Sequence, residues 1–313
     1  MDTMGRSSVI TIESLSKRYG ASTVVDNISF VAPAGRVTGF LGPNGAGKST
    51  SMRMMVGLTS PTPGSATISG RRFADLRNPG REVGVMLDAS AQHAGRTGRE
   101  ILTIAQRMMG LPGRRVAEML ELVSLTETEA NRRVGNYSLG MRQRLGIATA
   151  LIGGPAVLIL DEPANGLDPA GIRWMRDLLR GYADQGGTVL LSSHLLREIE
   201  VIADDIVMIG NGRIVCQGSK TQLLQSAGTI ARAADMYALK RAFDTSGLPT
   251  TVSDDGALRT DADPTRVGRV AHEAGVALIE LRTVDGGLEE MFLQLTADTQ
   301  RERADTQRER KGA

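Results

Sequence analysis

Short apolar runs rich in β-branched residues recur through the first two thirds of the chain and alternate with longer stretches in which apolar residues return every three or four positions. The first pattern is typical of buried strands and the second of amphipathic helices. Six runs are predicted as strands: 9–12, 37–41, 83–87, 157–160, 189–191 and 206–209. Five stretches are predicted as helices: 48–56, 99–109, 113–124, 138–152 and 169–182. This alternation predicts an α/β domain with a mostly parallel sheet.

Changes in pattern along the chain predict how it divides into domains. Three of the predicted helices fall together between about residues 95 and 152, which indicates a helical subdomain inserted into the sheet domain. A helix predicted at 220–225 closes this domain, which we place at residues 1–226. Residues 229–296 give the order strand, helix, strand, strand, helix, strand, helix. That order predicts a small α+β domain, with a ferredoxin-like arrangement as a candidate.

The heptapeptide ADTQRER occurs twice at the end of the chain, at 297–303 and at 304–310. Seven residues is the period of a coiled coil, which needs two apolar positions in each of several successive heptads. Each copy of the repeat offers only an alanine. We therefore expect residues 297–313 to form a solvated, fraying helix or a disordered tail rather than a coiled coil.

Composition narrows the class of protein. Hydrophobic residues make up 41% and charged residues 23% of the 313, as in ordinary globular proteins. The net charge is only +2, so nothing predicts a nucleic-acid partner. Cys216 is the only cysteine, which excludes an intrachain disulfide and favours the cytosol. No run approaches the roughly 18 apolar residues of a membrane span, so any work at a membrane is expected to use the helices of a partner.

A glycine-rich segment, GPNGAGKST at residues 42–50, follows the predicted strand 37–41 and precedes a predicted helix. It is a complete G-x-x-x-x-G-K-[ST] phosphate loop in the context that this motif requires. Its glycines let backbone N–H groups face a phosphate, and Lys48 is predicted to reach the β- and γ-phosphates while the Ser49 hydroxyl takes a Mg²⁺ position. The residues predicted to bind ATP here are Gly42, Asn44, Gly45, Gly47, Lys48, Ser49 and Thr50.

The predicted buried strand 157–160 ends in two carboxylates, Asp161 and Glu162. For the pair alone, an ordinary acidic end of a strand is the alternative interpretation. Beside a phosphate loop, Asp161 fits the Walker B carboxylate that holds Mg²⁺, and Glu162 fits a general base that polarises the attacking water.

The segment YSLGMRQR at residues 137–144 precedes a predicted apolar helix just before the strand 157–160. It resembles the signature motif of ABC transporter ATPases, usually written LSGGQ. Ser138 and Gly140 match that consensus. Three positions depart from it: Tyr137, Leu139 and Met141. Ser138 is predicted to cap the helix, where a γ-phosphate would meet free backbone N–H groups, and a plain helix cap is the alternative.

Three more residues occupy places that the ABC ATPase family uses. Asp168, in NGLD at 165–168, falls at the D-loop, which reaches across the dimer in that family. His194 follows a predicted strand and resembles the switch histidine that contacts the γ-phosphate, whereas a lone histidine is more often structural. Tyr19 resembles the aromatic residue that stacks on adenine, with a partly exposed surface tyrosine as the alternative.

The resemblance covers residues 9 to about 225 and has one dissenting position. Where the family usually has a glutamine after the third strand, this chain has Asp88. A carboxylate can ligate Mg²⁺, as an amide carbonyl does, but when ionised it cannot donate a hydrogen bond. We expect Asp88 to keep the metal role together with Ser49 and Asp161. Gln92 is the alternative ligand, and a simple loop acid is the other interpretation of Asp88.

The resemblance implies an ATP-binding and hydrolysing subunit of an ABC transporter, with ATP and Mg²⁺ as cofactors. It implies a head-to-tail homodimer with ATP between the phosphate loop of one copy and Ser138, Gly140 and Met141 of the other. Separate permease subunits would hold this dimer at the cytoplasmic face of the cell membrane. Asp88, the variant signature and the C-terminal domain resemble the bacterial drug and bacteriocin exporter branch, which implies a drug, antibiotic or peptide as cargo.

Two rival functions were weighed against this interpretation. A soluble ABC ATPase that acts on translation or DNA would be expected to carry a second nucleotide domain or a long coiled-coil insertion, and neither occurs in the sequence. A nucleotide sensor that does not hydrolyse ATP is disfavoured because Lys48, Asp161, Glu162 and His194 are all present.

Overall fold

The computed structural model of the chain describes residues 9–194, 196–225, 228–253 and 255–283. The chain divides into two compact units between Gly218 and Ser219. The helix at 220–225 therefore groups with the second unit rather than with the first. The predicted tail at 297–313, with its ADTQRER repeat, lies outside the described residues.

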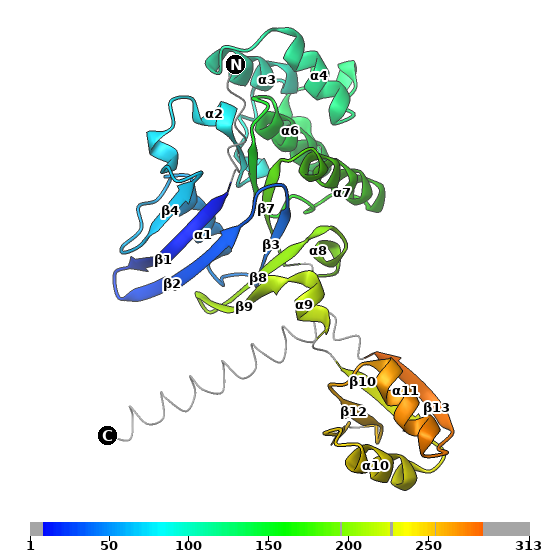
Figure 1. Cartoon of the computed structure of the whole chain (residues 1–313). Coiled ribbons are helices and arrows are strands. Elements are labelled where there is room, and N and C mark those ends of the chain that lie inside the picture. Colours follow the sequence, from blue (N-terminus) through cyan, green and yellow to red (C-terminus); the bar gives the residue numbers. More distant parts are fainter. Residues whose placement is uncertain (1–8, 195, 226–227, 254, 284–313) are drawn as a thin grey trace, which may run out of the picture. The chain divides into compact units, whose positions relative to one another are not determined.

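The larger unit is built on a six-stranded sheet with the strand order β5-β6-β7-β3-β8-β9 (Figure 1). Its strands are β3 Val37–Leu41, β5 Val83–Met86, β6 Val157–Leu160, β7 Thr188–Ser193, β8 Asp205–Gly210 and β9 Arg213–Ser219. The neighbouring pairs from β5 to β8 are all parallel. Strands in such a sheet are covered on both faces, which explains why their sequences are almost continuously apolar. Parallel pairing also places the residues that follow β3, β6 and β7 at one edge of the sheet.

A second, antiparallel sheet corrects part of the predicted topology. It has the order β2-β1-β4, formed by β1 Ile10–Tyr19, β2 Ser22–Ala32 and β4 Ser65–Ile68. The run at 9–12, expected in the mostly parallel sheet, is instead the start of the long strand β1. The prediction missed β2 because polar side chains alternate with apolar ones along this half-exposed strand. Phe30 of β2 lies against Phe40 of β3, with their ring centroids 5.3 Å apart, and helps to join the two sheets.

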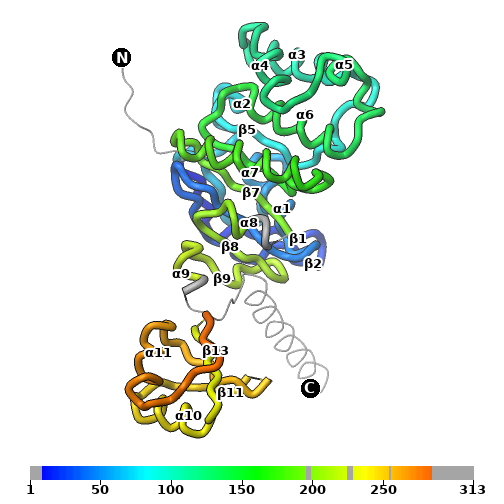
Figure 2. Tube along the Cα trace, turned by 90° about the vertical axis from the view of Figure 1, so that its right-hand side faces the viewer, coloured from blue at the N-terminus to red at the C-terminus, as the bar shows by residue number. Residues whose placement is uncertain are grey.

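The helices of the larger unit surround these sheets. They are α1 Lys48–Met55, α2 Pro79–Glu82, α3 Gly98–Met108, α4 Arg114–Leu122, α5 Glu127–Ala130, α6 Leu139–Leu151, α7 Pro169–Asp184 and α8 Leu196–Ile202, with short 3-10 turns at Phe73–Asp75, Ala89–Ala91 and Val134–Asn136. Three of them, α3, α4 and α6, contact one another and gather with α5 at one end of the unit (Figure 2). No helix in the described ranges combines the length and the apolar character that crossing a lipid bilayer requires.

The second unit begins with α9 Lys220–Gln225 and has a four-stranded antiparallel sheet. Its other elements are β10 Thr229–Ala233, α10 Met236–Thr245, β11 Thr251–Val252, β12 Leu258–Thr260, α11 Pro264–Glu273 and β13 Leu278–Thr283. The strand order β11-β12-β10-β13 places the first strand between the third and the fourth. This is the ferredoxin-like arrangement that the order of elements predicted. The last predicted helix lies outside the described residues.

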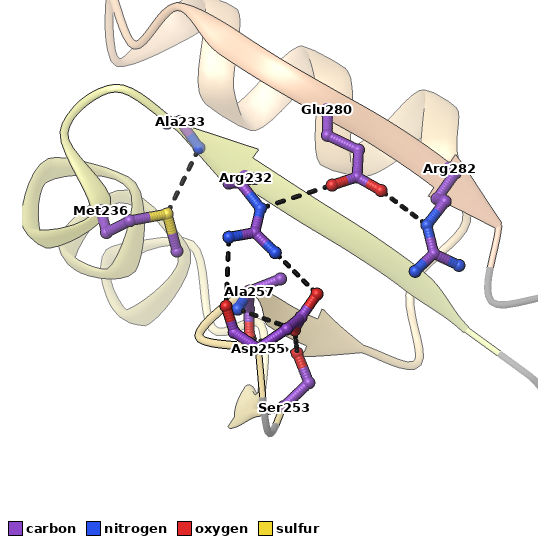
Figure 3. Close-up of polar contacts among 8 residues, drawn as sticks. All are labelled: Arg232, Ala233, Met236, Ser253, Asp255, Ala257, Glu280 and Arg282. Atoms are coloured by element: carbon purple, nitrogen blue, oxygen red, sulfur yellow. Dashed lines mark hydrogen bonds and ion pairs between the residues drawn. The ribbon is translucent and has the colours of Figure 1, made fainter.

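The two faces of this small sheet differ in chemistry. Ala231 and Ala233 of β10 belong to the core that the two helices cover, so Arg232 between them faces the other way. The Arg232 guanidinium donates to the Asp255 Oδ2 atom at 2.6 Å and lies 3.4 Å from the Glu280 Oε2 atom of β13 (Figure 3). A hydrogen bond from Arg282 lowers the pKa of the Glu280 carboxyl. The face opposite the helices is therefore a network of charged side chains.

The core of the second unit makes a testable prediction. Phe243 of α10 is fully buried, so Phe243→Ala removes a large apolar side chain and leaves a cavity. We expect the free energy of unfolding of this unit to fall by about 3–5 kcal/mol. Hydrogen exchange at the amides of residues 229–283 measures the loss. Tyr237→Ala on the same helix is the matched control, because Tyr237 is 75% exposed. Equal effects of the two changes would contradict the assigned core.

Candidate active site

The phosphate loop lies between β3 and α1. Lys48, the first residue of α1, is 5% exposed, and its Nζ atom donates to the carbonyl oxygens of Gly42 at 2.6 Å and Pro43 at 3.3 Å. These bonds curl the loop around the lysine ammonium. The first backbone N–H groups of a helix lack partners within the helix and carry a partial positive charge, so the start of α1 is suited to an anion. Ser49 and Thr50 lie in that first turn.

Two glycines of this loop are required by close approach. A Cβ atom at Gly42 would lie 2.3 Å from the carbonyl oxygen of Ile209. Gly47 has a φ of 108°, and a Cβ atom there would lie 2.9 Å from the carbonyl oxygen of Val24 on β2. A side chain at either position would therefore push the loop away from the strands on which it rests.

The acidic pair that follows β6 is held by a buried serine. Asp161 is 7% exposed and accepts a hydrogen bond from the Ser192 hydroxyl. The backbone N–H of Glu162 donates to the same Ser192 Oγ atom at 3.0 Å. Ser192, near the end of β7, thus fixes both acids at once. This role of Ser192 was not predicted from the sequence, although the polar pair Ser192 and Ser193 at the end of an apolar strand is a signal for it.

The Glu162 carboxylate joins the three elements of the site. Its Oε2 atom lies 2.8 Å from the Nδ1 atom of His194, which follows β7. Its Oε1 atom lies 3.4 Å from the Lys48 ammonium at the start of α1 and has no hydrogen-bond partner among the residues that the structure describes. The structure therefore brings together Lys48, Glu162 and His194, which the sequence places far apart. A carboxylate held between a cation and an imidazole can accept a proton from a water molecule beside a bound phosphate.

Glu162 has an unusual backbone conformation. Its φ of 49° lies in the left-handed region, which non-glycine residues rarely adopt and which costs free energy. The carbonyl oxygen of Glu162 accepts a hydrogen bond from the Nε2 atom of Gln143 at 3.3 Å. Gln143 lies on α6 and is 4% exposed. Gln143 belongs to the segment YSLGMRQR, but its contact with Glu162 was not predicted from the sequence.

The signature segment forms the start of α6. Ser138 caps the helix, as predicted, and its side chain accepts from the Met141 N–H at 3.2 Å. Gly140 lies close to Gly166, since a Cβ atom at Gly140 would be 3.1 Å from the Gly166 carbonyl oxygen. Within the described residues, no hydrogen bond or ion pair joins the segment 138–141 to the phosphate loop of the same chain.

The departure from the consensus at Tyr137 has a local structural reason. Tyr137 is 5% exposed, and its hydroxyl donates to the carbonyl oxygen of Glu129 at 2.6 Å. The Tyr137 hydroxyl lies so close to Gly98 that a Cβ atom at that glycine would be only 2.4 Å from it. Tyr137 is thus a packed residue of the helical region. Leu139, in contrast, is 45% exposed.

Asp168 and Tyr19 lie on other elements, at the start of α7 and at the end of β1. Asp168 caps α7, because its Oδ1 atom accepts from the Gly171 N–H at 2.8 Å. Tyr19 ends β1 and pairs with Ser22 at the start of β2, the strand whose Val24 adjoins Gly47. Its ring is 53% exposed, and the Lys17 ammonium lies 5.0 Å from the ring centroid. An exposed ring of this kind is available for stacking.

Asp88 follows β5 and caps a short 3-10 turn. Its Oδ1 atom accepts from the hydroxyl of Ser90 at 2.6 Å and from the Ser90 N–H at 2.7 Å. These hydrogen bonds hold the pKa of the Asp88 carboxyl below its ordinary value, so the side chain is ionised at neutral pH. The alternative ligand Gln92 instead turns toward α6, where its Nε2 atom donates to the Arg142 carbonyl oxygen at 3.1 Å.

The oxygen donors fit a magnesium ion. Mg²⁺ is usually bound by one or two carboxylates, phosphate oxygens and waters rather than by a cage of protein ligands. Asp161, Asp88 and the Ser49 hydroxyl follow β6, β5 and β3 and are oxygen donors of the required kind.

Comparisons with known proteins agree with this geometry. Residues 25–165 match the family model described as "ABC transporter". An uncharacterised ABC transporter ATP-binding protein of Bacillus subtilis, YhcH, is 33% identical over 303 residues, which cover 94% of this chain and 98% of the relative. The bacitracin transport ATP-binding protein BcrA of Bacillus licheniformis is 41% identical over 67% of this chain and 69% of the relative.

A solved structure shows the same fold. The chain resembles the ATP-binding subunit of an ABC transporter with a TM-score of 0.61 and 28% sequence identity. The likeness covers 76% of this chain and 95% of the solved one. The predicted fold class, a P-loop NTPase of the ABC ATPase type, is confirmed.

The double role of Ser192 can be tested by measuring stability. Ser192→Ala removes the donor to Asp161 and leaves the buried Glu162 N–H without an acceptor, so we expect the free energy of unfolding to fall by about 1–3 kcal/mol. Ser51→Ala is the matched control. Ser51 is equally buried, but its hydroxyl only donates to the Gly47 carbonyl, which also accepts from the Ser51 N–H. Urea denaturation measures both losses. A larger loss of unfolding free energy in Ser51→Ala than in Ser192→Ala would contradict the role of Ser192 in holding Asp161 and Glu162.

Proposed function

The chain belongs to the ABC transporter family as an ATP-binding subunit that hydrolyses ATP, and we propose that two copies of it act head to tail. Each ATP would lie between the phosphate loop of one copy and residues 138–141 of the other. The observation that carries the hydrolytic part of this proposal is the position of the Glu162 carboxylate between Lys48 and His194. It supplies a base, a cation for the phosphates and an imidazole at one edge of the sheet.

Each residue of this site has a proposed role in hydrolysis. The backbone of Gly42, Asn44, Gly45 and Gly47 and the side chains of Lys48 and Thr50 bind the phosphates, and Tyr19 stacks on adenine. Glu162 accepts the proton of the attacking water, and His194 contacts the γ-phosphate. Ser49, Asp88 and Asp161 would hold Mg²⁺, which neutralises charge on the transferred phosphate. The chain then acts by positioning and electrostatics.

The geometry of α6 supports the proposed second copy. Ser138 is exposed, and the described contacts leave the start of α6 apart from the phosphate loop of its own chain. A second chain placed head to tail would bring Ser138, Gly140 and Met141 to the γ-phosphate from the other side. Asp168, at the start of α7, lies close to this surface through the contact between Gly140 and Gly166. We expect a single copy to be a poor ATPase for this reason.

The partners and the cargo are also part of the proposal. A groove of about 360 Å³ lies beside Asp88, lined among others by Arg53, Leu58 and Ile101. The lining combines apolar side chains, among them Leu58, which is 69% exposed, with the charged Arg53 and Asp88. We propose that separate permease subunits dock there and hold the dimer on the inner face of the cell membrane. By analogy with the bacitracin transport relative, the cargo is a drug, antibiotic or peptide that is exported.

The variant Glu162→Gln tests the proposed base. An amide keeps the shape of the side chain but cannot accept the proton of water, so ATP binding should persist while turnover falls at least about a hundredfold. ATP-bound dimers should accumulate, and size-exclusion chromatography with Mg-ATP detects them. Glu127→Gln, at an exposed glutamate of α5, is the control and should behave like the parent. Parental turnover in a folded Glu162→Gln variant would remove Glu162 from this role.

Asp88 gives a second test through magnesium. If its carboxylate ligates the metal, Asp88→Ala should raise the Mg²⁺ concentration needed for half-maximal ATPase activity by about tenfold, and Asp88→Gln should raise it less. Ser90→Ala is the control for the turn itself, since it keeps the carboxylate and removes a hydrogen bond to it. Identical Mg²⁺ titrations for the parent and Asp88→Ala would show that Asp88 is only a loop acid.

A further inference from the structure

We infer that Gln143 is a positioning residue that holds the backbone of Glu162 in the conformation from which its carboxylate works. This inference rests on the proposed function, in which Glu162 is the general base. Among the described residues, the hydrogen bond from Gln143 to Glu162 goes to the peptide and not to the carboxylate. Its Nε2 atom donates to the Glu162 carbonyl oxygen at 3.3 Å.

The Glu162 peptide needs such a restraint because of its conformation. A φ of 49° is disfavoured for a residue with a side chain, so an unrestrained glutamate would relax toward the ordinary regions of φ and ψ. Relaxation would rotate the Cα–Cβ bond and move the carboxylate away from Lys48 and His194. Ser192 accepts from the N–H of this residue. Its carbonyl oxygen accepts from the Asn165 N–H at 3.1 Å and from the Gln143 side chain at 3.3 Å, so the residue is held from both sides and Gln143 supplies the only one of these carbonyl bonds that a side-chain substitution removes.

The Oε1 atom of Gln143 indicates that this side chain has a role other than stabilising the fold. Its Oε1 atom is buried and has no hydrogen-bond partner within the described residues. An unpaired buried oxygen destabilises the folded state. An apolar side chain of the same length would avoid that cost at a position that is 4% exposed. What only the amide provides here is a donor aimed at Glu162.

Gln143 also lies where it can link two parts of the site. It occupies the second turn of α6, the helix that begins beside Ser138, while Glu162 follows β6. The hydrogen bond therefore ties the start of the signature helix to the acidic pair within one chain. A loss of this bond should leave the nucleotide-binding residues in place and alter only the placement of the base.

The test compares two isosteric variants of the full chain with the parent. Gln143→Met keeps the length and volume and removes both polar groups, and Gln143→Glu puts an acceptor where the donor was. We expect kcat for ATP hydrolysis to fall about 10- to 100-fold in both. KM for ATP should stay within about twofold, because Lys48 and the loop are untouched. The melting temperature of Gln143→Met should equal or exceed that of the parent, since the unpaired oxygen is gone.

Tyr182→Phe is the matched control, because it removes another side-chain bond to a backbone carbonyl near the opposite end of the same strand. The Tyr182 hydroxyl donates to the Pro155 carbonyl oxygen at 2.8 Å, just before β6 begins. Its kcat should match that of the parent.

Three outcomes would overturn the inference. They are parental kcat in Gln143→Met, a melting temperature that falls together with kcat in that variant, and an equal loss of kcat in Tyr182→Phe. Glu162→Gln, measured alongside, separates a failure of Gln143 as the positioning residue from a failure of Glu162 as the general base. If it is inactive while Gln143→Met is parental, the inference alone fails; if it retains turnover, the proposed base fails first.

Discussion

The position of the Glu162 carboxylate depends on its contacts with Lys48 and His194, so the site joins three elements that are distant in sequence. Lys48 begins α1 after β3, Glu162 follows β6 and His194 follows β7. These strands are neighbours, in the order β6-β7-β3, and they run parallel. Parallel pairing puts their carboxyl ends at one edge, where a cation, an acid and an imidazole meet over the start of a helix. Without that strand order, the same residues would remain scattered.

Buried polar side chains hold this arrangement at some cost to stability. Ser192 bridges Asp161 and Glu162, and Gln143 donates to the carbonyl of Glu162, while the Gln143 oxygen has no partner in the described part of the chain. Glu162 itself keeps a disfavoured backbone conformation. Strain and unsatisfied groups of this kind persist only where the surrounding structure over-determines them, and they gather at functional sites. The apolar strands on either side supply the stability that this polar cluster does not.

The second unit has a different physical basis. It has its own apolar core around Leu239, Phe243 and Val267, and its sheet carries charged side chains on the other face. Pairing of Arg232 with Asp255 and Glu280 satisfies those charges locally. Such exposed pairs contribute little to stability, so the fold of this unit rests on its apolar core.

Local pattern in the sequence was enough for much of this protein. The apolar runs predicted the parallel strands. The phosphate loop, together with the acids at 161–162, predicted ATP hydrolysis. The order of elements after residue 229 predicted the ferredoxin-like sheet. Each of these signals lies within a few neighbouring residues. The antiparallel strand β2 was not predicted, because polar side chains alternate with apolar ones along it and weaken the apolar signal.

Only the tertiary structure decided which of those segments meet. Strand order placed His194 and Lys48 on the two oxygens of Glu162, and the packing of α6 against the acidic pair revealed Gln143. Asp88 proved to be held by Ser90, while Gln92 turned to α6. The longest of these contacts joins residues 114 positions apart, Lys48 and Glu162, and no local pattern encodes it. Such contacts arise because burial of the apolar strands forces distant polar side chains to pair with one another.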